Sequence, residues 1–365
     1  MPVSDSIGPG PFCGMLFSDM GADVIRIDRK GANAGRMSRL EIDRRGRRSV
    51  SLDLKRPESV AACLALCEAA DVVFEGYRPG VMERLGLGPD EMLKRNPRIV
   101  YGRMTGWGQY GPYAHRAGHD INYIAITGAL DAIGTKDRPV PPLSLVGDYA
   151  GGAMMLAVGL LSAVLHARST GQGQVVDAAI SDGSSYLMAA FYGLRAQGRW
   201  QEQRAANLID GGAPFYDTYR CADGRFIAIG AIEPQFYSLL LEKIGLAGKL
   251  PNEQMDRAAW PAIKATFAEI FATKTRDQWV EIMGDADTCF APVLTADEAT
   301  QDPHNVARST FVEIDGVRQP APAPRFSRTP AAIQASGTSA AVRSLLQDWG
   351  LPQQYVDQLA DTAKV

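Results

Sequence analysis

A histidine and an aspartate each stand at the start of a stretch whose apolar pattern predicts a helix. His119 precedes the stretch 121–130, and Asp148 opens the longer stretch 149–166. If both helix starts face one cleft, an imidazole and a carboxylate can lie on opposite sides of one carbon atom. That arrangement suits removal of a proton from one face of the carbon and return of a proton to the other.

Each of these residues also has a plain structural interpretation. Asp148 and Asp120 are at predicted helix starts, and Glu233 directly precedes Pro234 and a helix, so all three are ordinary N-cap candidates. A lone histidine is more often structural than catalytic. His119, however, lies at a helix start that favours a neutral imidazole. It also follows several glycines that allow close approach of a ligand (108, 111 and 118).

The length and composition are typical of a globular protein. The 365 residues suffice for two domains, with 46% hydrophobic and 22% charged residues and a net charge of −3, which argues against a nucleic-acid binder. Residues 29–56 hold ten Lys/Arg against three Asp/Glu, a local balance of +7. This block is either a solvated face or a receptor for a phosphorylated ligand. Five cysteines form no CxxC pair, so we expect reduced thiols and no metal.

Helix and strand patterns alternate through the first half of the chain. This alternation predicts an α/β fold with a mostly parallel sheet and helices on both faces. From about residue 214 a hairpin and three helices predict a smaller α+β domain. We therefore expect a large domain over 1–185, completed by about 320–365, a linker over 186–213, a small domain over 214–305 and a return linker over 306–320.

Basic residues follow successive predicted strands, where doubly wound folds bind ligands. They are Arg29, Lys55, Arg78 and Arg84. Neither GxGxxG after a strand nor a Walker A motif occurs. The opening residues lack a basic and then apolar run, and the uncharged stretch 149–165 carries three glycines. We therefore expect a cytoplasmic protein in which that stretch is a buried helix and not a membrane span.

Several motifs together resemble those of the α-methylacyl-CoA racemases, a group in the family III CoA-transferase superfamily. The resemblance extends in order from residue 7 to about residue 330. The motifs are IGPGP at 7–11, GADVIRIDR at 21–29, SLDLK at 51–55, EGYRPG at 75–80, RMTGWG at 103–108, GHDINY at 118–123 and VGD at 146–148.

The resemblance implies a reaction and a site. His119 and Asp148 would be the two bases of a 1,1-proton transfer beside a thioester carbonyl, through an enolate. Glu233 would orient the histidine from the small domain of a partner subunit, and backbone N–H groups near Asp120 would stabilise the enolate oxygen. The implied CoA-binding residues are Arg29, Leu52, Asp53, Leu54, Lys55, Gly76, Tyr77, Arg78, Arg84, Gly118, Ile121, Asn122 and Tyr123.

The resemblance also implies an assembly and a set of partners. Its fold is a Rossmann-like large domain plus a small domain in an interlocked homodimer. The substrate would be a 2-methylacyl-CoA thioester, with CoA as part of the substrate and no metal or redox cofactor. No nucleic acid or membrane partner is expected.

The first residues depart from this pattern. Family members begin with a strand before the IGPGP loop, and residues 1–6 replace it here. Because that strand is central in such a domain, its loss is expected to leave unpaired edges and exposed apolar area. We favour a true start upstream of Met1 over a truncated and less stable protein.

Two alternatives stay open. In a CoA-transferase of the same superfamily, an aspartate at the position of Asp148 is a nucleophile that forms an anhydride with the acyl group. His119 favours the racemase, because the transferases lack a histidine there. The second alternative is a non-catalytic acyl-CoA-binding paralogue, against which the full set of site residues argues.

Overall fold

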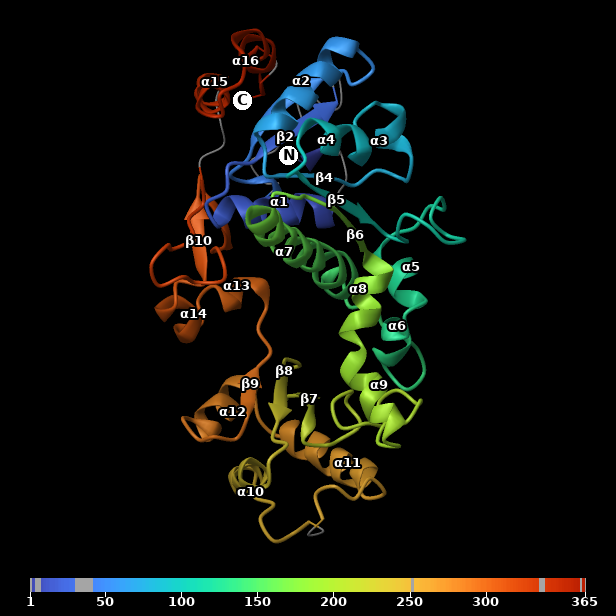
Figure 1. The fold of residues 1–365 in the computed structure, drawn as a ribbon. Coiled ribbons are helices and arrows are strands. Elements are labelled where there is room, and N and C mark those ends of the chain that lie inside the picture. Colours follow the sequence, from blue (N-terminus) through green and yellow to red (C-terminus); the bar gives the residue numbers. More distant parts are fainter. Residues whose placement is uncertain are drawn as a thin grey trace. The chain divides into compact units, whose positions relative to one another are not determined.

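The computed structural model describes residues 2–3, 8–29, 42–250, 253–334, 339–361 and 363–364. The chain divides into two compact units (Figure 1). The large unit comprises Met1–Ala129, Pro142–Met188 and Ser309–Val365, and the small unit comprises Leu130–Pro141 and Ala189–Arg308. The sequence-based boundaries at 185 and 306–320 lie close to this division, but residues 189–213 group with the small unit and are not a separate linker.

A seven-stranded sheet forms the centre of the large unit, in the order β12-β3-β2-β1-β4-β5-β6. All neighbouring strands are parallel except β12, which is antiparallel to β3. The strands are β1 (Pro2–Val3), β2 (Ile25–Arg29), β3 (Arg48–Leu52), β4 (Val72–Glu75), β5 (Val100–Thr105), β6 (Val175–Ala179) and β12 (Ala363–Lys364). The predicted parallel α/β architecture is confirmed.

The central strand position, which the sequence predicted to be empty, is occupied. Val3 of β1 pairs with Ile27 of β2 and with Glu75 of β4. The expectation of two unpaired central edges is therefore wrong. The occupying strand has two residues, whereas β2 has five and β4 has four, so the neighbouring strands are bridged over only part of their length.

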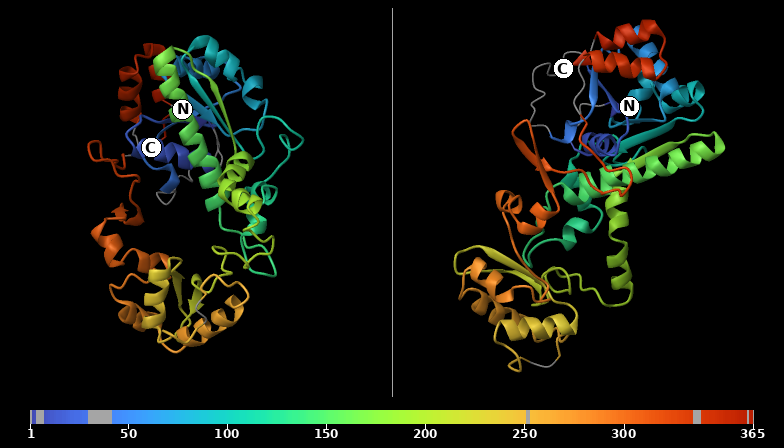
Figure 2. Two further views of the ribbon diagram at one scale, coloured as in Figure 1. Left: turned by 60° about the horizontal axis from the view of Figure 1, so that its bottom comes forward. Right: turned by 90° about the vertical axis from the view of Figure 1, so that its left-hand side faces the viewer.

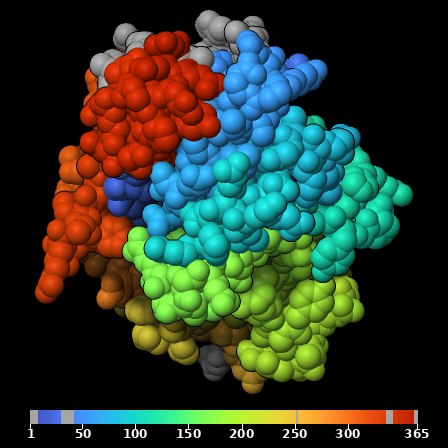
Figure 3. Space-filling model, turned by 45° about the horizontal axis from the view of Figure 1, so that its top comes forward, coloured from blue at the N-terminus to red at the C-terminus, as the bar shows by residue number. Residues whose placement is uncertain are grey.

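Helices cover both faces of this sheet (Figure 1). Helices α1 (Pro9–Asp19) and α7 (Met155–Thr170) pack on one face in a core with Phe74, Val100 and Met104. The other face is covered by α2 (Pro57–Ala69), α3 (Val81–Arg84), α4 (Pro89–Arg95), α15 (Ser339–Asp348) and α16 (Gln353–Ala360). Figure 3 shows the two C-terminal helices as one surface beside α2.

One apolar stretch, Leu145–Thr170, has the length and composition of a membrane span. Its α7 part buries Leu156, Leu160 and Ala163 against the sheet. The prediction of a helix packed in the core is confirmed for this side of α7.

The strand order indicates where a ligand would be expected to bind. From β1 the chain proceeds to β2 and β3 on one side, and β4, β5 and β6 follow on the other. In open parallel sheets, ligands bind at the carboxyl ends of the strands where the order reverses. The loop 76–80, which follows β4, lies at that point.

The small unit has its own sheet and core. Strands β7 (Tyr216–Arg220), β8 (Phe226–Gly230) and β9 (Phe290–Pro292) form an antiparallel sheet. Helices α10 (Pro234–Lys243), α11 (Trp260–Phe271) and α12 (Arg276–Met283) pack with it around Phe215, Phe267 and Trp279. Figure 2 shows these helices gathered about the strands. The unit also holds α9 (Ala189–Ala196), α13 (Ala296–Ala299) and α14 (Pro303–Ala307). The predicted hairpin and three helices are confirmed.

Several elements differ from the sequence-based expectation. The stretch 121–130 forms two short helices, α5 (Asp120–Ala125) and α6 (Ala129–Ala132). The expected linker over 186–213 contains the end of α8 (Ile180–Leu187) and the whole of α9. The longer stretch begins with a π-helix, η2 (Leu145–Met154). The expected return linker contains the hairpin of β10 (Phe311–Ile314) and β11 (Val317–Pro320). Part of the basic block, 30–41, lies outside the described residues; its following residues form the short 3₁₀ helix η1 (Ile42–Arg44).

Candidate functional site

Asp148 lies on a π-helix in which two glycines allow very close contact with neighbouring segments of the chain. A Cβ atom at Gly147 would lie 2.1 Å from Oδ1 of Asp120, and one at Gly151 would lie 2.4 Å from Oγ of Ser184. Only glycine fits such close contacts without movement. π-Helical segments occur often at functional sites. Local periodicity did not reveal this one, because its cause is packing between distant segments.

A direct hydrogen bond joins the two predicted site segments. The backbone N–H of Asp148 donates to Oδ1 of Asp120 at 2.7 Å. Asp120 is the first residue of α5, and His119 is its N-cap, with an extended φ of −132°. The N–H of His119 in turn donates to the side chain of Asn122 at 3.0 Å. Asp120 therefore fixes the start of η2 relative to the segment that carries His119.

The electrostatic environment of Asp148 suits proton transfer near neutral pH. Burial is the main cause that raises its pKa from 3.8 to about 6, and the nearby Asp120 carboxylate raises it further, whereas His119 acts in the opposite direction. Asp120 contacts Asp148 directly through a hydrogen bond, and His119 is the neighbour of Asp120 in the chain. A carboxyl group with such a pKa can both accept and donate a proton at physiological pH.

Aromatic residues form one side of this region. The Tyr123 ring packs edge-on against Trp107 at 4.8 Å, and its hydroxyl donates to the carbonyl of Gly118. Burial first, and then Asp148, raise the pKa of Tyr123, while Arg78 lowers it. Tyr123 therefore lies near both the candidate base and the loop that follows β4.

The predicted CoA-binding residues lie at the carboxyl edge of the sheet. Arg29 ends β2 and is exposed, Lys55 is exposed in the turn after β3, and Arg78 is exposed in the loop after β4. The Lys55 N–H donates to Asp53 at 3.1 Å, which fixes that turn. The other residues of the set in this region are Leu54, Gly76, Tyr77 and Arg84, and the α5 segment holds Gly118, Ile121, Asn122 and Tyr123.

Leu52 is the exception within this set. Its side chain is buried in the core below α2, so only its backbone faces the edge of the sheet. A contact of the Leu52 side chain with CoA is not supported by the structure.

Sequence reasoning missed a charged cluster beside the loop after β4. Arg103, on β5, bonds Glu75 at 3.2 Å and Glu83 at 2.8 Å. Both Glu75 and Arg103 occur in the motifs that carry the family resemblance, but neither was assigned a role. The signal available in the sequence was a charged residue in each of two apolar strands, β4 and β5.

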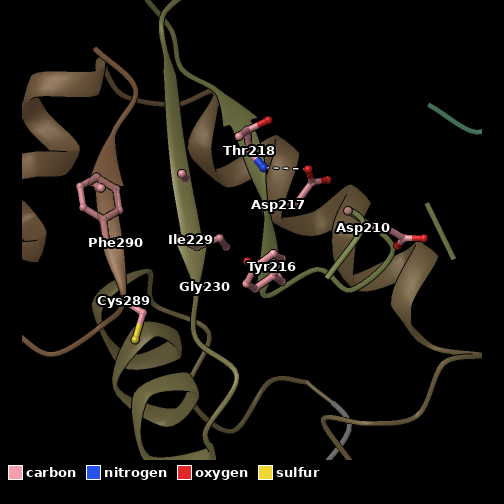
Figure 4. A pocket seen from close by; sticks show the side chains of 11 residues that line it. Asp210, Tyr216, Asp217, Thr218, Ile229, Gly230, Cys289 and Phe290 are labelled. Atoms are coloured by element: carbon pink, nitrogen blue, oxygen red, sulfur yellow. Dashed lines mark hydrogen bonds between the residues drawn. The ribbon is translucent and has the colours of Figure 1, made fainter. Parts of the chain in front are cut away.

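Glu233 lies in the small unit, as the exposed N-cap of α10. Near it an open pocket of about 520 Å³ is lined by residues that include Tyr216, Ile229, Cys289 and Phe290 (Figure 4). Burial and then the charge of Glu233 raise the pKa of Cys289, so the carboxylate and the pocket are neighbours.

Metal-binding chemistry finds no support among the described residues. Within that part of the chain, no group of three or more His, Cys, Asp or Glu side chains could hold an ion. All five cysteines are free thiols, and only Cys289 is exposed.

Comparisons with known proteins identify the family of this chain. The sequence profile of CoA-transferase family III matches residues 4–339. The chain is 42% identical to α-methylacyl-CoA racemase of Mus musculus over 359 residues, which cover 97% of this chain and 93% of the mouse protein. It is 45% identical to the Homo sapiens racemase over 330 residues, 89% of this chain and 85% of that protein.

A more distant relative and a solved structure extend the comparison. Succinyl-CoA–D-citramalate CoA-transferase of Chloroflexus aurantiacus is 30% identical over 90% of this chain and 87% of its own. The crystal structure of Rv3272 from M. tuberculosis superposes with a TM-score of 0.74 at 26% identity, covering 92% of this chain and 95% of that one. The chain belongs to CoA-transferase family III.

Proposed function

We propose that the protein is an α-methylacyl-CoA racemase, which interconverts the (R) and (S) forms of 2-methylacyl-CoA thioesters. The observation that carries the proposal is the joined pair of segments that bear His119 and Asp148, with the Asp148 pKa raised to about 6. High identity to two curated racemases over most of the chain supports the same activity.

The reaction proceeds by two proton transfers at the α-carbon. The neutral imidazole of His119 removes the α-proton, and the electron pair of the C–H bond moves toward the thioester carbonyl to give an enolate. The protonated carboxyl of Asp148 then donates a proton to the opposite face of the same carbon. In the reverse direction, the Asp148 carboxylate is the base and the imidazolium is the acid.

The enolate oxygen needs donors that are already in place, because a thioester α-proton is a weak acid. Backbone N–H groups at the start of α5, beside Asp120, are the donors that we propose. The hydrogen bond from Asp148 to Asp120 holds this backbone next to the second base. No metal or redox cofactor is required for this chemistry, and CoA enters as part of the substrate.

We further propose that the enzyme is a homodimer with shared active sites, in which Glu233 of one chain orients His119 of the other. The outward face of α7 supports a second copy. Val158 is 58% and Leu165 69% exposed, with Met154 and Leu161 on the same face. Residues 154–166 contain no charged side chain. Such an uncharged apolar stripe is typical of a surface covered by another protein.

The free thiols are consistent with a cytoplasmic protein.

The alternative is a CoA-transferase with Asp148 as nucleophile. The similarity to the citramalate CoA-transferase is the observation that favours it. One experiment separates the two activities. A single enantiomer of a 2-methylacyl-CoA is incubated without an acceptor acid, and chiral analysis follows its optical purity. The racemase loses optical purity under these conditions. Optical purity that persists, with CoA transfer once a free acid is added, would establish the transferase.

Variants assign the two bases in the same assay. His119→Ala and Asp148→Ala are each expected to lower racemisation by about 10²- to 10⁴-fold, the usual contribution of a general acid–base group. Binding of the CoA ester, measured by calorimetry, is expected to stay close to that of the wild type. Full racemisation by either variant would remove that residue from the mechanism.

A further inference from the structure

One guanidinium group holds both ends of the loop that follows β4. Glu75 is the last residue of β4 and is 2% exposed, while Glu83 lies on α3. Nε of Arg103 contacts Oε1 of Glu75 at 3.2 Å, and a terminal nitrogen contacts Oε1 of Glu83 at 2.8 Å. Arg103 is itself 8% exposed, so the arrangement is a built part of the interior.

The segment between these two glutamates carries predicted CoA-binding residues. Oε2 of Glu75 accepts the backbone N–H of Tyr77 at 2.7 Å, inside the loop itself. Gly76 and Arg78 flank Tyr77, and Arg84 directly follows Glu83. One carboxylate therefore lies directly before the loop, and the other lies directly before Arg84.

We infer that Arg103 is a positioning residue that, through Glu75 and Glu83, orders the loop 76–80 and Arg84 for binding of the CoA moiety. This inference rests on the proposed function, which assigns that loop to CoA. It adds a role for residues that touch no reacting atom.

The physical reason is preorganisation. Burial raises the pKa of Glu75 to about 7, and the Tyr77 N–H and Arg103 act in the opposite direction. Arg103 thus helps to keep a buried carboxylate charged, and that carboxylate holds the Tyr77 backbone. A planar guanidinium can donate in two directions at once, which a lysine cannot reproduce with the same geometry. Order that exists before binding lowers the entropy cost of binding.

A structural role alone would also explain a buried ion pair, so the test must separate order in the loop from stability of the fold. Glu83→Ala is the suitable variant. The Glu83 side chain is 45% exposed, so its removal is compatible with folding, and Arg103 retains Glu75. A matched control is Glu68→Ala, which removes a glutamate of similar exposure that pairs with Arg95 at 3.1 Å, away from the loop.

Two readouts apply to the wild type and each variant. Hydrogen exchange of the loop amides needs no ligand, and calorimetry with CoA itself measures binding. Glu83→Ala is expected to speed exchange over 76–80, to weaken CoA binding by about fivefold and to raise KM with kcat unchanged. Glu83→Gln is expected to restore these values, because its amide oxygen still accepts from Arg103. Glu68→Ala is expected to change none of them.

The outcomes distinguish this inference from the proposed function. Unchanged loop exchange and unchanged CoA affinity in Glu83→Ala would overturn the positioning role while leaving the proposed function intact. An equal loss in Glu68→Ala would also overturn it, because the effect would then be general. A wild type that fails to bind CoA would contradict both the proposed function and the inference that rests on it.

Discussion

Asp148 shows how the fold changes the chemistry of a single residue. From the sequence it is an ordinary N-cap candidate, and its type and place alone do not separate capping from catalysis. In the structure, burial and the Asp120 carboxylate raise its pKa to about 6. The close contacts of Gly147 explain how the two acidic groups come so near each other.

The raised pKa predicts an acid limb in the pH profile of racemisation. In the direction in which the Asp148 carboxylate is the base, kcat/KM falls below about pH 6, because the carboxylate becomes protonated. Asp120→Asn keeps an oxygen that accepts the Asp148 N–H but removes the charge that raises this pKa. The limb is therefore expected at lower pH in that variant. The measurement is kcat/KM as a function of pH. A wild-type limb near pH 4, or a limb that Asp120→Asn does not move, would contradict this explanation.

Prediction from the sequence was uneven at this scale. Helix starts and strand ends drew attention to His119, Asp148 and the basic residues, but only the family resemblance gave them roles, because position alone does not separate capping from catalysis. The cluster of Glu75, Glu83 and Arg103 was missed, because the three side chains come together only when β4, β5 and α3 are adjacent. The sequence also did not show that the Leu52 side chain is buried in the core, which leaves its backbone as the part available to a ligand.

At the scale of elements, the π-helix η2 depends on its fit against α8. A Cβ atom at Gly183 would lie 1.9 Å from the carbonyl oxygen of Gly151, which is backbone and cannot rotate away. The pattern of residues 149–166 predicted a regular helix, since local periodicity carries no information about such contacts. The prediction of an empty central strand position was wrong for a related reason. Residues 2–3 pair within the sheet through backbone atoms, and such pairing requires no particular side chains.

Gly183→Ala is expected to lower the free energy of unfolding by about 1–3 kcal/mol, the usual cost of overpacking. Activity should fall as well, because η2 carries Asp148. The matched control is Gly193→Ala on α9, where an added Cβ meets nothing within 4 Å. That change should be neutral or slightly stabilising through helix propensity. Denaturant unfolding and racemisation of both variants provide the comparison, and a fully stable, fully active Gly183→Ala would refute the packing argument.

At the scale of the whole molecule, the site residues belong to two units. His119 and Asp148 lie in the large unit, whereas Glu233 lies in the small unit. The proposed homodimer combines them across chains. Composition and periodicity could predict the two domains, but assembly came only from the family resemblance, because the stripe on α7 is apparent only after burial is known.

Complementation tests the shared site. His119→Ala and Glu233→Gln chains are co-expressed with different tags, and mixed dimers are purified. If sites are shared, each mixed dimer has one complete site of two, and the purified mixed dimers regain roughly half of wild-type activity. Each variant alone serves as the control. Mixed dimers without activity above these controls would place each site within one chain.

The central claim is that two bases act on opposite faces of one carbon, and the fate of the α-proton tests it most directly. One enantiomer of a 2-methylacyl-CoA is converted in deuterium oxide, and both enantiomers are analysed by mass spectrometry at early times. Two bases predict product that carries deuterium from the start, while recovered substrate stays largely unlabelled. Early product that retains the substrate's own proton would require a single base and would contradict the account.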